Sequence, residues 1–454
     1  MNRNLKFDYD KEPSRDILCL DCKSFYASCE AVALGYDPLK VKLVVMSYPS
    51  DSPQKRGSGL ILASSPQAKK AYNISNVSRA RDLPYPYPDD LVIVAPRMNL
   101  YMEVNKTINN IYRTFVSDED IAVYSVDETF LDVTNSLAYF DCDTAYDLAK
   151  MIQTKVFNET GIYTTVGIGD NPLLAKLALD NESKLNQDMK AEWRYEDVKT
   201  KLWSIPKLTD FWGIGAKTEI RLRKLGIKSI YELSQYNYYE LKDKMGVIGA
   251  QLFAHSWGID RTFLGEVYTP KSKSIGNSQV LPKDYTKQSE IEIIIREIAD
   301  QVATKLRRDG LYTQSISLWI GYSLNFIDEE GKTGFSKQIK ITNTNNTKII
   351  AKHLIQLFRQ HYYGQSVRNI GVSTTKLNDE GHQQLSLFDN VETVEINEDI
   401  DKVVDKVRSR FGFSKLIYLS SKQEGARALE RSKLVGGHAG GMIGLENKES
   451  KKKN

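Results

Sequence analysis

A pair of adjacent carboxylates, Asp127 and Glu128, interrupts the otherwise apolar stretch AVYSVDETFLDVT. The pair falls where a two-residue turn would join two strands, so we predict a β-hairpin with both acids at its tip. An Asp-Glu pair, with Glu at the second turn position, is not favoured in a left-handed turn, and two like charges side by side repel each other unless a cation lies between them. The pattern therefore indicates a cation beside the hairpin.

A third carboxylate, Asp21, ends the apolar stretch DILCLD, which we expect to form a strand next to the hairpin. Three carboxylates at one edge of a sheet can hold two Mg²⁺ ions, because this hard cation prefers oxygen ligands and binds phosphates with its remaining positions. Such a pair of ions clamps the attacking and leaving oxygens of phosphoryl transfer. Spacing alone leaves a second interpretation open, in which these are ordinary surface acids.

The elements that would position these acids alternate between strand and helix over residues 1–185. The apolar runs VKLVVMS, GLILASS, LVIVAP and TTVGIGD are typical of strands, and helices are expected at 24–32 and 98–115. In NPLLAKLALD, Asn171 as cap and Pro172 at the first helical position predict a further helix start. We therefore predict an α/β core.

Residues 186–260 have a helical pattern punctuated by glycine. Two stretches, FWGIGAKTEIRLRKLGI and KMGVIGAQLFAHSWGID, resemble helix-hairpin-helix elements. The turn at Gly213-Ile214-Gly215 precedes a helix start, where backbone N–H groups can bind a phosphate. The alternative is a set of tight turns between packed helices.

The segment 271–378 carries the positive charge of the chain, with 16 Lys and Arg against 9 Asp and Glu, whereas the whole chain has a net charge of only +4. Its predicted order is strand, helix (290–308), strand, strand, helix (348–361), strand, which matches the ferredoxin-like βαββαβ motif. With both helices on one face, the other face of the sheet is free for a nucleic-acid backbone. A solvated basic surface is the alternative.

The bulk composition is that of a folded protein with room for about three domains, since 41% of its 454 residues are hydrophobic and 26% are charged. The start of the chain lacks the apolar core of a signal peptide, and no apolar stretch approaches the roughly 18 residues of a membrane span, so we expect a cytosolic protein without membrane partners. Cys19, Cys22 and Cys29 lie close together, but no histidine is nearby, which favours buried thiols over a zinc site.

The stretches LDCKSFYASCEAV and YSVDETFLDVT together resemble the catalytic motifs of Y-family DNA polymerases, the lesion-bypass enzymes, in particular the UmuC-like branch. The resemblance extends over most of the chain and implies a multidomain α+β fold, with an α/β palm, small fingers, a helical thumb and a ferredoxin-like little finger. The implied boundaries are 1–34 and 98–185 for the palm, 35–97 for the fingers, 186–262 for the thumb, 263–273 for a linker, 274–378 for the little finger and 379–454 for a C-terminal tail.

The resemblance makes Asp21, Asp127 and Glu128 the catalytic carboxylates that bind two Mg²⁺ ions, with the carbonyl of Cys22 as a further ligand. The position two residues after Asp21 is often a second acid in the family, and here it is Lys23. This difference affects the details of metal ligation and leaves the three carboxylates in place.

Tyr26 matches the steric gate of the family, an aromatic ring beneath the incoming sugar that would clash with a ribose 2′-hydroxyl. Without the resemblance, Phe25 and Tyr26 could equally be core aromatic residues at the start of a helix. The residues that the resemblance assigns to the incoming nucleotide are Ser24, Phe25, Tyr26, Lys69, Lys70 and Lys176. Lys176 would reach the triphosphate, although a lone lysine on a helix is normally solvated, and either Lys69 or Lys70 would supply a further positive charge.

Two further contacts follow from the resemblance. Gly213, Gly215 and Lys217 of the first helix-hairpin-helix turn would bind DNA. In HQQLSLFDN, the residues Gln384, Leu385, Leu387 and Phe388 resemble the peptide that binds the bacterial sliding clamp, and exposed apolar groups in a polar segment often mark a partner site. The alternative is a strand buried against the preceding module. From about residue 377 the chain is polar, so we expect a disordered tail around this peptide.

The implied function is template-directed DNA synthesis of the translesion type, in which the primer 3′-hydroxyl attacks the α-phosphate of a dNTP and electrostatics supplies most of the catalysis. The implied partners are primer-template DNA, dNTPs, the sliding clamp and other proteins of the SOS response, in a cytoplasmic, nucleoid-associated setting. Two rival hypotheses are another palm-bearing nucleotidyl transferase or cyclase, and a catalytically inactive scaffold tethered to DNA by the clamp.

Overall fold

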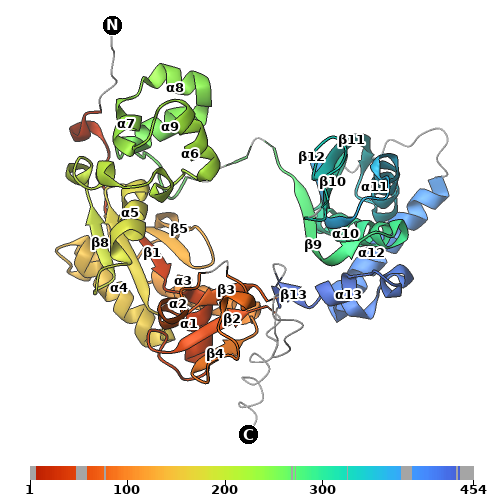
Figure 1. The fold of residues 1–454 in the computed structure, drawn as a ribbon, viewed down its shortest axis with the longest axis horizontal. Helices are drawn as coiled ribbons and strands as arrows, with labels where there is room; N and C mark the ends of the chain where they lie inside the picture. Colours follow the sequence, from red (N-terminus) through yellow and green to blue (C-terminus); the bar gives the residue numbers. More distant parts are fainter. Residues whose placement is uncertain are drawn as a thin grey trace. The chain divides into compact units, whose positions relative to one another are not determined.

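The computed structural model describes residues 7–47, 59–75, 78–266, 269–270, 272–324, 326–379, 391–435 and 438–439, without the side chains of 391–398 and 438–439. The chain forms two compact units, residues 1–267 with 438–454 and residues 268–437 (Figure 1). Within the described residues, every helix is too short or too polar to cross a membrane.

The first unit is built on a five-stranded sheet with the order β5-β6-β1-β7-β8. Its strands are β1 (Ile17–Cys22), β5 (Ile121–Val123), β6 (Glu128–Asp132), β7 (Thr164–Gly169) and β8 (Lys190–Trp193). Strand β1 is antiparallel to both β6 and β7, whereas β7 is parallel to β8. The register places Asp21 opposite Glu128, so two acids that are far apart in the sequence meet at one end of the sheet.

The helices around this sheet largely follow the predicted pattern. They are α1 (Phe25–Ala33), α3 (Met98–Tyr112), α4 (Ala145–Thr160) and α5 (Pro172–Ala178), which continues into a π-helical turn at Leu179–Ser183. Helix α5 packs very closely on β7 because β7 has glycines at the contact. A Cβ atom on Gly167 would lie only 2.0 Å from the carbonyl oxygen of Ala175. This close approach fixes the position of Lys176, the next residue of α5.

A second, three-stranded sheet of the first unit has the order β3-β2-β4. Its strands are β2 (Lys42–Met46), β3 (Ile61–Ser64) and β4 (Leu91–Val94), and helix α2 (Pro66–Tyr72) packs on β2. Strand β2 is antiparallel to β3 and parallel to β4. All three strands were expected from their apolar runs. Helix α1 packs on β2 and β3, so this small sheet lies beside the start of α1 and the end of β1.

The helical prediction for residues 186–260 is wrong at residues 190–193, which form strand β8 of the five-stranded sheet. From residue 216 the region is helical as predicted, with α6 (Ala216–Lys224), α7 (Ile230–Gln235), α8 (Tyr238–Met245) and α9 (Val247–Ser256). The apolar residues of these helices form one core with Leu173, Leu174 and Leu177 of α5 and with Trp193 of β8. The helical region is therefore joined to the helix that carries Lys176. The short strand β14 (His438–Ala439) also belongs to the first unit.

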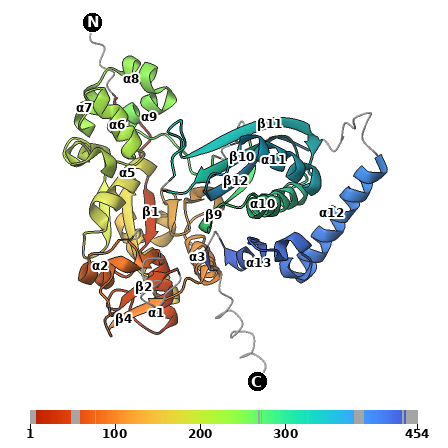
Figure 2. The ribbon, with the colours of Figure 1, turned by 45° about the vertical axis from the view of Figure 1, so that its right-hand side comes forward.

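The second unit confirms the βαββαβ prediction. Its elements in chain order are β9 (Ile275–Tyr285), α10 (Gln288–Arg308), β10 (Tyr312–Tyr322), β11 (Gly334–Thr344), α11 (Thr347–His361) and β12 (Val367–Asn378). The sheet order is β11-β10-β12-β9, and all neighbouring strands are antiparallel. Both helices pack on one face of this sheet (Figure 2). Helix α10 has one fully buried apolar side, formed by Ile291, Ile294, Ile295, Ile298, Val302 and Leu306.

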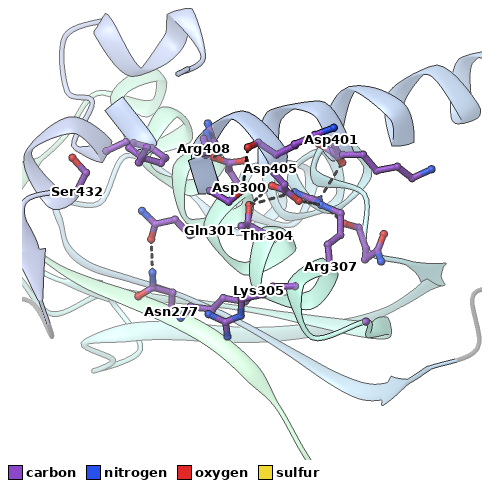
Figure 3. A pocket seen from close by; sticks show the side chains of 18 of the residues that line it. Asn277, Asp300, Gln301, Thr304, Lys305, Arg307, Asp401, Asp405, Arg408 and Ser432 are labelled. Carbon is purple, nitrogen blue, oxygen red and sulfur yellow. Dashed lines mark hydrogen bonds and ion pairs between the residues drawn. The ribbon is translucent and has the colours of Figure 1, made fainter. Parts of the chain in front are cut away.

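The expectation of a disordered tail after residue 378 is wrong for residues 391–435. This segment forms α12 (Val391–Phe411), α13 (Ala428–Arg431) and the short strand β13 (Leu434–Val435). The reason is a set of buried ion pairs between α10 and α12. Arg307 lies 3.2 Å from Asp401 and 2.6 Å from Asp405, and Arg408 lies 2.7 Å from Asp300. Figure 3 shows these side chains beside a cavity of about 1250 Å³ between the two helices.

Candidate active site

The hairpin that carries the acid pair has a different turn from the predicted one. Strand β5 ends at Val123 and β6 begins at Glu128, so the turn comprises residues 124–127 and Glu128 is a strand residue. Ser125 closes this turn, because its hydroxyl donates to the carboxylate of Asp127 over 2.7 Å and accepts the backbone N–H of Glu128 over 3.1 Å. These hydrogen bonds stabilise a longer turn, which does not require the left-handed backbone conformation of a two-residue turn.

The three predicted carboxylates come together at the end of β1. Asp21 is paired in register with Glu128, and the backbone N–H of Cys22 donates to the carbonyl of Asp127 over 2.9 Å. Burial raises the pKa of Asp21 to about 6, and the nearby charges of Asp127 and Glu128 add to this rise while Lys184 opposes it. Asp127 and Glu128 are therefore close enough to Asp21 to act on it electrostatically.

The cations beside the acids are two lysine ammonium groups. Lys176 Nζ lies 2.5 Å from Glu128 Oε1 and 3.0 Å from Asp180 Oδ2. Lys184 Nζ lies 2.9 Å from Asp21 Oδ2 and 2.8 Å from Asp180 Oδ1. The four contacts form a continuous chain of alternating charge from Glu128 to Asp21. Burial opposes protonation of Lys184, but the two carboxylates beside it outweigh burial and raise its pKa.

Lys184 and Asp180 were not identified from the sequence. Both follow Lys176 at four-residue intervals in AKLALDNESK, and residues four apart on a helix are neighbours. This spacing was the signal that could have found them. The π-helical turn at Leu179–Ser183 gives the segment its final geometry, and such turns are frequent at functional sites.

The donor chemistry of this site suits a hard divalent cation, although the carboxylates are bound to lysines. Across the part of the chain that the structure describes, no three His, Cys, Asp or Glu side chains are arranged around a common metal position. The oxygen donors that converge here are nevertheless those that Mg²⁺ prefers. Burial is the main cause of the raised pKa of Asp21, and the charges of Asp127 and Glu128 add to it. The residues therefore fit a divalent metal by their chemistry.

The thiols of Cys19, Cys22 and Cys29 are buried, as expected of strand and helix cysteines.

A cavity of about 410 Å³ opens beside the acids and brings most of the predicted nucleotide-binding residues together. The predicted residues that line it are Asp21, Cys22, Ser24, Phe25, Tyr26, Lys69 and Asp127. Lys184 also lines the cavity, whereas Glu128, Lys70 and Lys176 do not. Lys70 is exposed, and Lys69 donates to the hydroxyl of Ser24 over 3.3 Å. Of the two lysines left open by the sequence, Lys69 is therefore the one beside the cavity.

Tyr26 has a well-defined support within the first unit. Its ring stacks on that of Tyr101, with centroids 4.5 Å apart and planes 14° apart. The hydroxyl of Tyr101 donates to the buried Glu30 over 2.7 Å, and Arg97 also binds Glu30. Phe25 and Tyr26 both line the cavity, but Phe25 is buried, as in the interpretation as a core aromatic residue. Stacking on Tyr101 therefore fixes the orientation of the Tyr26 ring.

The turn before α6 lies at the surface of the first unit. Gly213 has a φ of +92°, a left-handed conformation that favours glycine, and Gly215 occupies the N-cap position without a side-chain cap. Gly213, Gly215 and Lys217 are all exposed, while Ile214 between the glycines is buried in the helical core. The turn therefore packs through Ile214 and leaves its backbone N–H groups accessible. The predicted clamp-binding residues, Gln384, Leu385, Leu387 and Phe388, lie outside the described residues.

Comparisons with known proteins agree with this architecture. Residues 20–180 match the model of the impB/mucB/samB family, residues 272–387 match its C-terminal domain, and residues 195–227 match the IMS family HHH motif. The chain is 38% identical to the "Putative UV-damage repair protein UvrX" of Bacillus subtilis (strain 168), over 95% of this chain and 99% of that protein. It is 32% identical to "DNA polymerase IV 2" of the same organism, over 93% of this chain and 98% of that protein.

The fold also matches a solved structure, a "Y-family DNA polymerase chimera Dbh-Dpo4(243-245)-Dbh". The TM-score is 0.61 at 21% identity, with 80% of this chain and 98% of that chain covered. The two units, the site and these matches together define a DNA-directed DNA polymerase with the multidomain α+β fold of the Y-family. The chain belongs to the impB/mucB/samB family. The resemblance to UmuC-like Y-family polymerases, which the sequence motifs indicated, is confirmed.

Proposed function

We propose that this polymerase performs translesion synthesis, joining a dNTP to a primer 3′-hydroxyl with two Mg²⁺ ions held by Asp21, Asp127 and Glu128. The observation that carries the proposal is the convergence of these carboxylates at the end of β1, next to the cavity lined by Ser24 and Tyr26. When bound, such ions neutralise phosphate charge and activate the attacking hydroxyl. The carbonyl of Cys22 is our candidate for a further ligand.

The lysines have two different roles in this proposal. Lys184 lines the cavity and is the better placed of the two to hold the triphosphate of the incoming nucleotide, together with Lys69 and the backbone of Ser24 and Phe25. Lys176 is buried against Glu128, so its charge balances that carboxylate. We retain Lys176 as a candidate for triphosphate contact once Glu128 has bound a metal.

Tyr26 is the proposed steric gate. Its ring borders the cavity and is held from behind by Tyr101, so it cannot easily turn away from a sugar that enters. A ribose 2′-hydroxyl would meet this ring, whereas a deoxyribose would not. The ring would thus select dNTPs over rNTPs by shape.

We assign DNA contacts to both units. In the first unit, the accessible N–H groups at Gly213 and Gly215, with Lys217, would bind a backbone phosphate. In the second unit, the sheet face opposite α10 and α11 is free to bind DNA. The proposed domains are those given by the resemblance: palm 1–34 and 98–185, fingers 35–97, thumb 186–262, linker 263–273 and little finger 274–378.

We further propose that Gln384, Leu385, Leu387 and Phe388 bind the bacterial sliding clamp, and that other proteins of the SOS response act with this polymerase. A relative named as a UV-damage repair protein supports a role in damage tolerance. A DNA repair polymerase would work in the cytoplasm, at the nucleoid.

Primer extension on undamaged and lesion-bearing templates tests the proposal. We expect extension with Mg²⁺ by the wild type, and a loss of extension in Asp127→Asn with DNA binding retained in a gel-shift assay. Equal extension by Asp127→Asn would exclude the metal mechanism. A wild type that binds DNA and the clamp without extending primers would favour the inactive scaffold, and template-independent cyclic products would favour a cyclase.

A further inference from the structure

In the second unit, the sheet face opposite α10 and α11 carries polar residues, glycines and the exposed Val280 around Trp319. Ile316, Leu318 and Ile320 point toward the helices and are fully buried. On the opposite face, the register places Trp319 of β10 between Ser336 of β11 and Gly371 of β12. The neighbouring positions on this face are held by Ser278, Ser317, Gly321, Gln338, Lys340, Asn369 and Ser373.

The indole of Trp319 lies flat on the sheet because two glycines leave room for it. A Cβ atom on Gly371 would lie 3.1 Å from Cε3 of the indole, and a Cβ atom on Gly321 would lie 3.2 Å from its Cζ2. The ring therefore spans the backbone of both glycines. Its relative exposure is 45%, so the ring is covered by the sheet on one side and open on the other.

Trp319 also differs from the other four tryptophans of the chain in its polar contacts. The remaining indole N–H groups, those of Trp193, Trp203, Trp212 and Trp257, each donate a hydrogen bond to an acceptor of the first unit. Within the described portion of the chain, the Trp319 indole has neither a hydrogen-bond acceptor nor an aromatic neighbour. Trp319 therefore offers a ligand both an exposed aromatic face and an unbonded indole N–H group.

We propose that Trp319 is a stacking platform for an unpaired nucleobase of the template strand. Bases within a duplex already use both of their faces, so a flat exposed ring can stack only on a nucleotide outside the duplex. The serine hydroxyls around the ring can bond to base edges, and Lys340 on the same face attracts the phosphate backbone. The inference rests on the proposed function, because the polymerase's template strand supplies the unpaired nucleotide.

The test compares Trp319→Ala and Trp319→Phe with the wild type, using fluorescence anisotropy of a labelled single-stranded oligo-dT and of a labelled blunt duplex. Stacking on one base predicts that Trp319→Ala binds the single strand about 5- to 100-fold more weakly. Binding of the blunt duplex should be unchanged, and Trp319→Phe should keep most of the single-strand affinity. Unlabelled oligo-dT should quench tryptophan fluorescence more in the wild type than in Trp319→Phe.

A ring that only covers the two glycines gives a different result. Trp319→Ala would then unfold at a lower temperature, bind oligo-dT as tightly as the wild type, and overturn the inference. Lys340→Glu tests separately whether this face of the sheet binds DNA at all. Lys340 lies on the same face as Trp319 but on a different strand, β11. Weaker DNA binding in Lys340→Glu alone would refute stacking and keep the contact, whereas unchanged binding in both variants would refute both.

Discussion

The chain of charges from Glu128 to Asp21 makes Lys176→Met the most informative single substitution. Methionine keeps the unbranched shape of the side chain but removes its charge. The side chain of Lys176 is only 7% exposed and that of Glu128 only 15% exposed, so the substitution leaves a buried carboxylate without its cation. Removal of one partner from a buried ion pair costs about 3–5 kcal/mol of the free energy of unfolding.

This loss has a measurable size. A change of 1 kcal/mol shifts the melting temperature of a unit of this size by about 2–4 °C, so we expect a decrease of roughly 6–20 °C in differential scanning fluorimetry. The matched control is the double variant Glu128→Gln with Lys176→Met, which removes both charges. The double variant should recover much of the lost stability, since no unpaired charge remains in it.

The same variant tests whether the acids bind a divalent cation. Without Lys176, Glu128 is free to bind Mg²⁺, and a ligand at 100 times its dissociation constant stabilises the folded state by about 2.7 kcal/mol. We therefore expect Mg²⁺ to raise the melting temperature of Lys176→Met more than that of the wild type or of the double variant. A Lys176→Met protein as stable as the wild type, or equally indifferent to Mg²⁺, would refute this reasoning.

Three further predictions concern other parts of the chain. Tyr26→Ala should raise ribonucleotide incorporation in primer extension with competing dNTPs and rNTPs, and an unchanged preference counts against the gate. Arg307→Met should destabilise the second unit by about 3–5 kcal/mol and speed hydrogen exchange in α12, because the buried Asp401 loses its cation; unaltered exchange would contradict this. Leu387→Ala with Phe388→Ala should weaken clamp binding and spare basal synthesis, whereas undiminished binding argues against the motif.

Periodic apolar patterns predicted most of the fold. Apart from β8 (Lys190–Trp193), which lies in a region expected to be helical, the strands of both sheets in the first unit and the six elements of the βαββαβ module lie within a few residues of their expected positions. The stripe of isoleucines on α10 is buried as expected, since an amphipathic helix buries its apolar side. These elements were predictable because the spacing of apolar residues along each segment shows whether it is a helix or a strand and which side is buried.

The features that sequence analysis missed depend on contacts between distant residues or on single side chains. The acid pair was placed at the wrong position in its turn because the hydroxyl of Ser125 reorganises that turn. The segment 391–435 looked like a polar tail because Asp401, Asp405 and Arg408 have the composition of a solvated surface. Their partners on α10 lie about a hundred residues earlier in the chain, so sequence period could not show that these charges are buried.

The site was predicted to a similar extent. Asp21, Asp127 and Glu128 were singled out because their strands could be recognised, and the pairing of β1 with β6 places Asp21 opposite Glu128. Their role as metal ligands stays a prediction. The ion pair between Lys184 and Asp21 was not predicted. Lys184 reaches Asp21 because of the π-helical turn after α5. Charge compensation within a site depends on such local geometry, and sequence spacing gives only a weak indication of it.

The most direct measurement of the central claim is a crystal structure of the protein with primer-template DNA, a non-hydrolysable dNTP analogue and Mn²⁺, which is located by its anomalous scattering. The proposal predicts manganese density bound by oxygens of Asp21, Asp127 and Glu128, with Lys184 turned from Asp21 toward the triphosphate. Density bound elsewhere, with Lys176 and Lys184 still paired to Glu128 and Asp21, would contradict it.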